Sequence, residues 1–165
     1  MLKIPSVILS TVPEGPLTGP ARACQALLTD PARCMALIVT LAEDLPASES
    51  KQLCDALTGM AIPRGPLVVN RLYAPRFNRG PNLLALNDAL ALPMGEAGGD
   101  LFPLLSAARL AHERSTMNEE YLEQLKSDLP LPQVRLPHLF RPRFDSAAID
   151  ELAERLGGQL AGLSL

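Results

Sequence analysis

The sequence lacks an excess of basic residues. Its 165 residues include 15 Lys and Arg against 18 Asp and Glu, which gives a formal net charge of −3 at pH 7. A protein that holds nucleic acid through its phosphates needs a basic face or stripe. The composition therefore argues against nucleic acid as the main partner.

Long apolar runs are missing as well. The longest, MALIVTLA at 35–42, is far shorter than the about 20 residues that a helix needs to cross a bilayer. The N-terminal stretch has one lysine, a short apolar run broken by Pro5 and no small-residue cleavage site, so it does not read as a secretory signal. We therefore expect a cytoplasmic protein, with at most a peripheral membrane partner.

Cysteine is scarce, and its spacing shows no paired motif. The three cysteines are Cys24, Cys34 and Cys54, with no CxxC spacing, and an odd number fits a reducing compartment better than a disulfide framework. Three thiolates can hold a soft thiophilic ion, but free cysteine is also among the most buried residue types. Core packing is the simpler interpretation, and the three cysteines stay candidates for a metal or metalloid site.

Short catalytic motifs are absent too. The sequence contains no GxxxxGK[ST] and hence no P-loop, and it contains no GxGxxG, HExxH or GxSxG. The two histidines, His112 and His138, have no acid–base partner nearby in the sequence. We therefore assign no catalytic residue.

Apolar side chains are what the chain has in quantity. They make up 47% of the residues, against 20% charged, which is typical of a globular protein. The length predicts a single domain over 1–165. Clusters of proline and glycine predict an extended, loop-rich lead-in over 1–20 and an irregular insert over 73–100.

Strand and helix patterns alternate along the rest of the chain. Strands are expected at 35–41, 67–72 and 133–137, and helices at 21–28, 48–60, 101–129 and from Asp145 onward. The continuous apolar run at 35–41 is typical of a strand buried on both faces. This order predicts an α/β fold, a partial doubly wound, Rossmann-like parallel sheet of about three strands with flanking helices. Three strands are few for such a fold, so we expect another chain, another copy or a further segment to complete it.

Polar residues stand where two of these strands end. Asn70 ends the second strand, and Pro137, His138 and Leu139 follow the third, at the sheet edge where ligands of open parallel sheets bind. An asparagine amide can pair bidentately with a purine edge. A proline followed by apolar residues can form a flat wall against a base. Asn70 can equally cap its own strand through local backbone hydrogen bonds, so both interpretations stay open on these residues alone.

A series of short motifs over about 27–163 resembles the C-terminal part of the ArsA-type ATPases. These are the anion-transporting ATPases and the related factor that targets tail-anchored membrane proteins. The matching residues occur in the family's order: Asp30-Pro31, Val39-Thr40, Glu43, Gly65, Val69-Asn70, Tyr121-Leu122 and Leu136-Pro137.

The resemblance implies a P-loop-NTPase-derived fold that uses ATP and Mg²⁺ and works as a dimer. In that family the V-N asparagine reads the adenine, and the loop after the last strand forms the other wall of the base pocket. This assigns adenine binding to Asn70 and the wall to Pro137, His138 and Leu139. The implied activity is metalloid or anion export, or membrane-protein targeting with a hydrophobic protein client.

The departures from the family limit what this chain does alone. The family's P-loop and switch residues have no counterpart here, so this chain should not hydrolyse ATP by itself. A P-loop-bearing half or subunit, in a homo- or hetero-oligomer, would supply phosphate and Mg²⁺ binding. Residues 71–133 contain no cysteine, so the zinc clasp of some members is unsupported. The alternative is a non-catalytic interaction module that kept the fold, lost the nucleotide and docks a partner through 73–100 and the apolar helix at 101–111.

Overall fold

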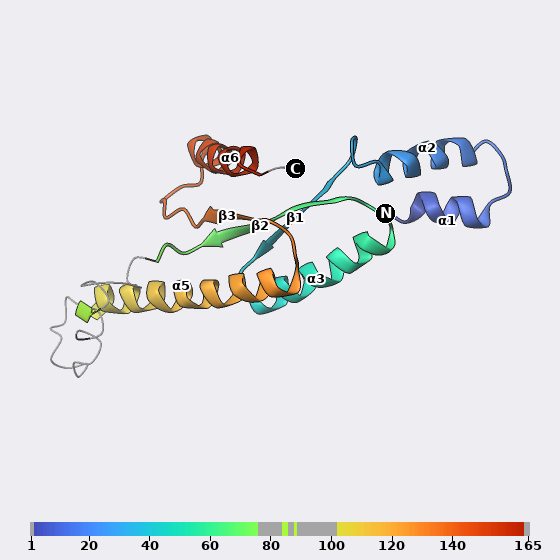
Figure 1. Cartoon of the computed structure of the whole chain (residues 1–165). Helices are drawn as coiled ribbons and strands as arrows, with labels where there is room; N and C mark the ends of the chain where they lie inside the picture. The colour runs from blue at the N-terminus through green and yellow to red at the C-terminus, as the bar shows by residue number, and fades with distance from the viewer. Residues whose placement is uncertain (1, 76–83, 86–87, 89–101, 164–165) are drawn as a thin grey trace.

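The computed structural model describes residues 2–75, 84–85, 88 and 102–163. Within these residues lies a three-stranded sheet of order β1-β2-β3, with each neighbouring pair parallel. The strands are β1 (Ala36–Leu41), β2 (Arg64–Leu72) and β3 (Gln133–Pro137). Helices α3 (Asp44–Gly59) and α5 (Phe102–Asp128) lie on one face, and α6 (Ser146–Ala161) lies on the other (Figure 1). The predicted α/β class and the three parallel strands are thus confirmed.

The central strand β2 separates two apolar cores. Its Leu67 and Val69 point toward α3 and α5, where they join a cluster that contains Ile38, Leu57, Leu122 and Leu125. Its Val68 points the other way and packs with Val134, Leu136 and the leucines of α6. Because both faces are covered, β2 is apolar at consecutive positions, as a doubly covered parallel strand requires.

Strand β1 is covered on one face only. Ile38 is 3% exposed beneath α3, whereas Leu37 is 41% exposed and Val39 is 61% exposed on the opposite face. The prediction that this strand is buried on both faces is therefore wrong. The reason is that α6 packs on β3 and β2 and leaves the corresponding face of β1 open.

The two outer edges of the sheet are treated differently. On β3, the side chain of Gln159 in α6 donates from Nε2 to the carbonyl of Arg135 (2.9 Å) and accepts at Oε1 from the Arg135 N–H (2.9 Å). One amide side chain thus satisfies both backbone groups of Arg135, which a further strand would otherwise bond. On β1, no residue of the described ranges pairs with the outer edge.

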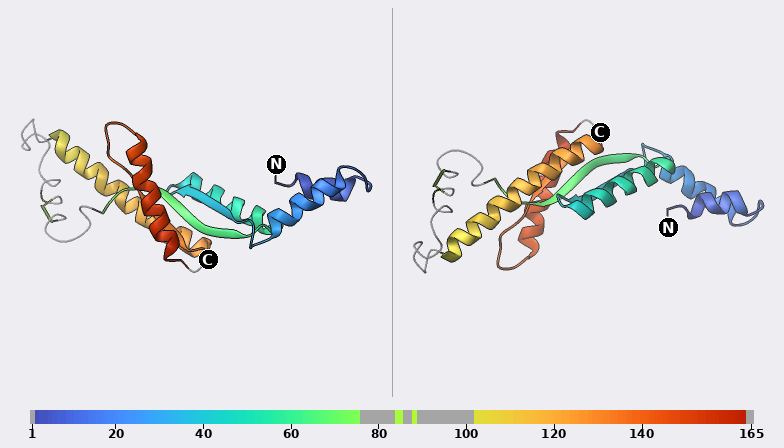
Figure 2. Two further views of the ribbon diagram at one scale, coloured as in Figure 1. Left: turned by 90° about the horizontal axis from the view of Figure 1, so that it is seen from above. Right: turned by 90° about the horizontal axis from the view of Figure 1, so that it is seen from below.

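The helices follow the predicted periodicity with shifted ends. Helix α3 begins at Asp44 rather than near Ser48, because Pro46 falls in its first turn, where proline is tolerated. The buried residues of α5 recur three or four apart: Ser115, Asn118, Leu122 and Leu125. The N-terminal part of α5 extends beyond the sheet (Figure 2). Asp145 caps α6, accepting at Oδ1 from the Ala148 N–H (3.1 Å).

The lead-in over 1–20 is not the loop that its prolines predict. It holds α1 (Ile4–Thr11) and the start of α2 (Thr18–Thr29), which pack together as a hairpin that projects from one end of the sheet (Figure 2). Pro5 lies in the first turn of α1 and Pro20 in the first turn of α2. Proline lacks an N–H that this turn does not use, so both helices form despite it.

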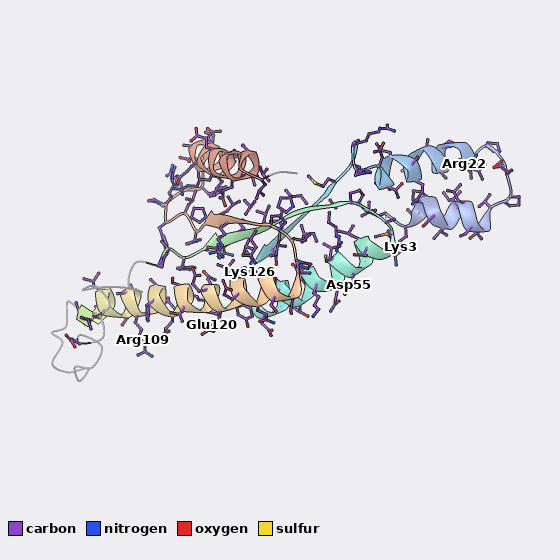
Figure 3. The ribbon with its side chains drawn as sticks, in the orientation of Figure 1. Lys3, Arg22, Asp55, Arg109, Glu120 and Lys126 are labelled. Carbon is purple, nitrogen blue, oxygen red and sulfur yellow. The ribbon has the colours of Figure 1, made fainter. Side chains whose placement is uncertain are left out.

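Most of the predicted irregular insert at 73–100 lies outside the described residues. Charged side chains occupy the outer surface of the described helices; Arg109 and Glu120, for example, project from the side of α5 that faces away from the sheet (Figure 3). None of the helices in the described ranges is both long enough and apolar enough to cross a membrane.

Candidate functional site

The carboxyl end of β2 carries a β-bulge. The register runs from Val69 opposite Arg135 to Leu72 opposite Pro137, so β2 has one more residue than β3 over this step. Arg71, inside the bulge, has a φ of 58°, in the left-handed region that non-glycine residues seldom adopt. Regular alternation would place Asn70 and Arg71 on opposite faces of the sheet, whereas here both line one cavity.

This cavity has a volume of about 290 Å³ and lies between the ends of β2 and β3 and the start of α6. Its walls are formed by Asn70, Arg71, Pro137, His138, Leu139, Phe144 and Leu152. The four residues that the sequence nominates, Asn70 and 137–139, therefore come together in one place. Sequence reasoning missed Arg71, Phe144 and Leu152; the apolar stripe of α6 was the available signal for Leu152.

The Asn70 amide is half used by its own chain. Its Oδ1 accepts a hydrogen bond from the Arg71 N–H (2.8 Å), which is the local backbone bond of the capping interpretation. Its Nδ2 has no hydrogen-bond partner in the described part of the chain. Because a carbonyl oxygen has two lone pairs, Asn70 can still accept one further bond while donating two. The local bond orients the amide and leaves a donor and an acceptor for a ligand.

Rings gather beside the cavity. The His138 ring stacks on Tyr73 with centroids 5.1 Å apart and an interplanar angle of 14°. Phe140 meets both rings edge-on, at 4.5 Å from His138 and 5.4 Å from Tyr73. The His138 N–H also donates to the Leu72 carbonyl (2.8 Å), which ties the end of β3 to the end of β2. Two ring contacts and a backbone bond hold the wall at His138 in a defined orientation.

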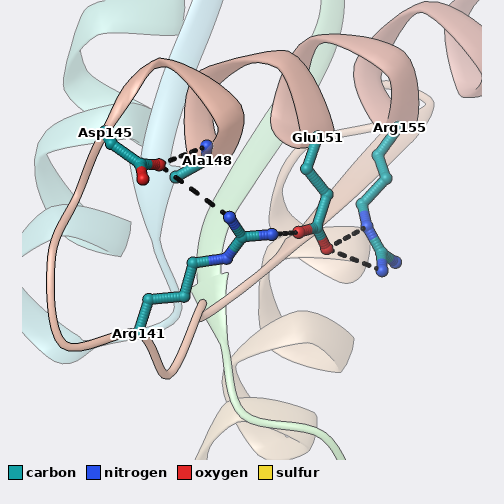
Figure 4. A network of polar contacts seen from close by, with 5 residues as sticks. All are labelled: Arg141, Asp145, Ala148, Glu151 and Arg155. Carbon is teal, nitrogen blue, oxygen red and sulfur yellow. Dashed lines mark hydrogen bonds and ion pairs between the residues drawn. The ribbon is translucent and has the colours of Figure 1, made fainter.

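An ion-pair network holds the segment that follows β3 against α6 (Figure 4). Arg141 binds Glu151 and lies 3.9 Å from the Oδ1 of Asp145. Arg155, one turn further along α6, also binds Glu151, with Nη2 3.0 Å from Oε1. Since Glu151 is 28% exposed and each arginine is more exposed, the network positions the loop more than it stabilises the fold.

A second cavity, of about 320 Å³, lies between β1 and α3. Val39 and Thr40 line it from the strand, Glu49 and Leu53 line it from α3, and Asn70 closes its carboxyl end. Asn70 thus borders both cavities.

The cysteines do not assemble. Cys24 is exposed on α2, Cys34 is half-buried before β1, and Cys54 is buried in α3. Arg64 donates from Nη1 to the Cys54 sulfur (3.0 Å). Among the described residues, no group of three or more His, Cys, Asp or Glu side chains is placed to hold a metal ion. The packing interpretation fits Cys54, which is 2% exposed.

Comparison with known proteins adds no name to this site. No protein-family model matches the chain, and no curated protein does. The residues of the cavity and the order of the motifs are therefore what points to a function.

Proposed function

We propose that this chain is the adenine-recognising, C-terminal portion of an ArsA-type ATPase, built on a P-loop-NTPase-derived fold. Asn70 would hydrogen-bond the base, and Pro137, His138 and Leu139 would line the ring. One observation carries the proposal. Residues that motif order nominated from two distant parts of the sequence share a single cavity at the carboxyl ends of parallel strands, where ligands of such sheets bind.

The chemistry of the cavity supports a purine ligand. Asn70 offers a free amide donor and a remaining acceptor site, the pair of groups that an adenine edge requires. The other walls are mostly apolar, as a flat ring needs, and the volume suits a base better than a large substrate.

ATP hydrolysis would need a second component. The sequence has no P-loop, so the phosphate-binding loop and the Mg²⁺ would come with a P-loop-bearing half or subunit. The outer edge of β1, with which no described residue pairs, and the cavity beside it support docking of such a partner in the cytoplasm, because Asn70 borders that cavity too. The assembled oligomer would then serve anion export or membrane-protein targeting, as the family does.

Binding of a fluorescent adenine nucleotide, mant-ATP, tests the proposal directly. Loss of a bidentate amide–base contact costs about 1–3 kcal/mol, so Asn70→Ala should weaken binding roughly 5- to 150-fold. The matched control is Glu120→Ala, which changes an exposed residue on α5 far from the cavity. GTP should compete less well than ATP. Equal affinity of the native chain and Asn70→Ala would show that Asn70 does not read the base.

A second function has its own observation in support. A cavity of about 220 Å³ lies between Tyr73, Phe140 and the N-terminal part of α5, and its other walls are alanines and Leu104. Phe140 is 61% exposed, Leu104 is 65% exposed and Leu110 is 55% exposed. An apolar surface of this kind suits an interaction module that docks a hydrophobic protein client.

The two functions separate in one pair of measurements. A solvatochromic dye such as bis-ANS should bind the surface at Phe140 and α5, and Leu104→Lys should abolish its signal. Dye binding that depends on Leu104, in a chain for which no adenine nucleotide shows measurable affinity, would favour the interaction module. Nucleotide binding that depends on Asn70 would favour the ATPase portion.

A further inference from the structure

Arg71 is the residue of the first cavity that the adenine proposal does not use. It lies in the bulge directly after Asn70 with a φ of 58°, and it lines the same cavity as Asn70. An arginine has no intrinsic preference for this backbone conformation, which glycine or asparagine adopts at less cost. Residues held in such conformations cluster at binding sites. The bulge therefore presents two neighbouring polar side chains to one ligand.

The guanidinium of Arg71 is also free of acidic partners. Within the described residues it forms no ion pair, whereas nearby Arg141 is neutralised by Glu151 and Asp145, and Arg135 lies 4.0 Å from Glu119. None of the residues that line the cavity is acidic. Arg71 is solvent-exposed, and the cavity combines its permanent positive charge, which has no acidic partner among the described residues, with mostly apolar walls. Such a site attracts an anion, and the planar guanidinium fork matches phosphate oxygens.

We propose that Arg71 binds the phosphate of the nucleotide whose base Asn70 contacts. This inference rests on the proposed function and makes it more specific, since the ligand becomes a nucleoside 5′-phosphate rather than a nucleoside or a free base. The side chain of arginine is long and that of asparagine is short. An extended arginine side chain can therefore place its guanidinium beyond the Asn70 amide, as the ribose between a base and its phosphate requires.

Isothermal titration calorimetry with three probes, AMP, adenosine and inorganic phosphate, tests the inference. Charge-assisted hydrogen bonds to phosphate should make AMP bind roughly 10- to 100-fold more tightly than adenosine. Arg71→Asn removes the charge and keeps a residue that tolerates a positive φ, so the bulge should persist. It should reduce AMP affinity to that of adenosine and leave adenosine affinity unchanged. Arg71→Lys should restore part of the difference, and the AMP affinity of the native chain should fall with added salt.

The controls separate this inference from the function beneath it. Arg33→Asn removes an exposed arginine that does not line the cavity, and it should bind all probes as the native chain does. If AMP binding depends on Asn70 and Arg71→Asn weakens it no more than Arg33→Asn does, Arg71 has no phosphate role and the adenine proposal stands. If AMP binding is insensitive to Asn70→Ala, or AMP does not bind, both ideas fail. Inorganic phosphate that binds as tightly as AMP would identify an anion site without a base and would overturn the inference.

Discussion

Replacing Asn118 by alanine should weaken the whole carboxyl edge of the sheet. Asn118 lies in α5 and is 5% exposed. Its Nδ2 donates to the carbonyl of Ala42, just after β1 (3.2 Å), and its Oδ1 accepts from the N–H of Tyr73, just after β2 (2.9 Å). One side chain thus holds two neighbouring strand ends to a helix from 45 residues further along the chain.

The loss of stability in Asn118→Ala depends on whether water can replace the side chain at the backbone groups of Ala42 and Tyr73. Ala42 is 1% exposed, so in Asn118→Ala its carbonyl has no water to replace the lost donor, at a cost of about 1–3 kcal/mol. Tyr73 is half-buried, so its N–H recovers a water and the net loss is about 1 kcal/mol. Together these losses reduce the free energy of unfolding by about 2–4 kcal/mol. For a chain of this length the melting temperature should fall by roughly 4–16 °C.

Urea and thermal unfolding followed by far-ultraviolet circular dichroism measure this loss. Glu120→Ala, on the exposed side of the same helix, is the matched control and should change stability by at most about 0.5 kcal/mol. The urea m value should stay the same in both variants, because the surface exposed on unfolding does not change. If Asn118→Ala unfolds at the same urea concentration as Glu120→Ala, the two hydrogen bonds do not join the strand ends and the reasoning is refuted.

Three further outcomes follow from contacts described above. Gln159→Ala should lower the free energy of unfolding by about 1–2 kcal/mol and increase self-association in light scattering, whereas Gln124→Ala on exposed α5 should do neither. Glu151→Gln should cost at most about 1 kcal/mol, and the difference should vanish at about 1 M salt; a loss that persists there would show a role beyond the ion pairs. Cys24 should react with a thiol reagent in the native chain and Cys54 only in denaturant, and equal labelling rates would contradict the burial of Cys54.

The strands could be predicted from their apolar residues. Which helices pack on each face of a strand could not be predicted. Residues 35–39 and 67–69 are both uninterrupted apolar runs, yet β2 is enclosed and β1 leaves Val39 exposed. An apolar run shows that a strand can be buried on both faces. It does not show which helix of the chain packs on it. The prediction of a loop-rich lead-in over 1–20 was wrong for a related reason. Pro5 destabilises a helix when it lies in the interior but is tolerated in the first turn, where it lies here.

The candidate site divides in the same way. Asn70 and Pro137 share a cavity because neighbouring parallel strands end at the same edge, a relation that topology imposes on any sequence of this order. The position of Arg71 in this cavity could not be predicted, because it depends on the register shift between β2 and β3. Neither glycine nor asparagine, the usual marks of a positive φ, stands at that position.

The side chain of Gln159 makes the two edges of the sheet differ in how readily a further strand can be added. On β3 the Gln159 side chain of α6 bonds the backbone of Arg135. An added strand would have to displace this side chain before it could pair with Arg135. On β1 no residue that the structure describes is bonded to the outer edge, and Val39 and Leu53 offer an added strand apolar contact. Addition of strands, whether by a physiological partner or during aggregation in concentrated solution, is therefore one-sided. The border at β1 is the surface that expression and crystallisation trials have to protect.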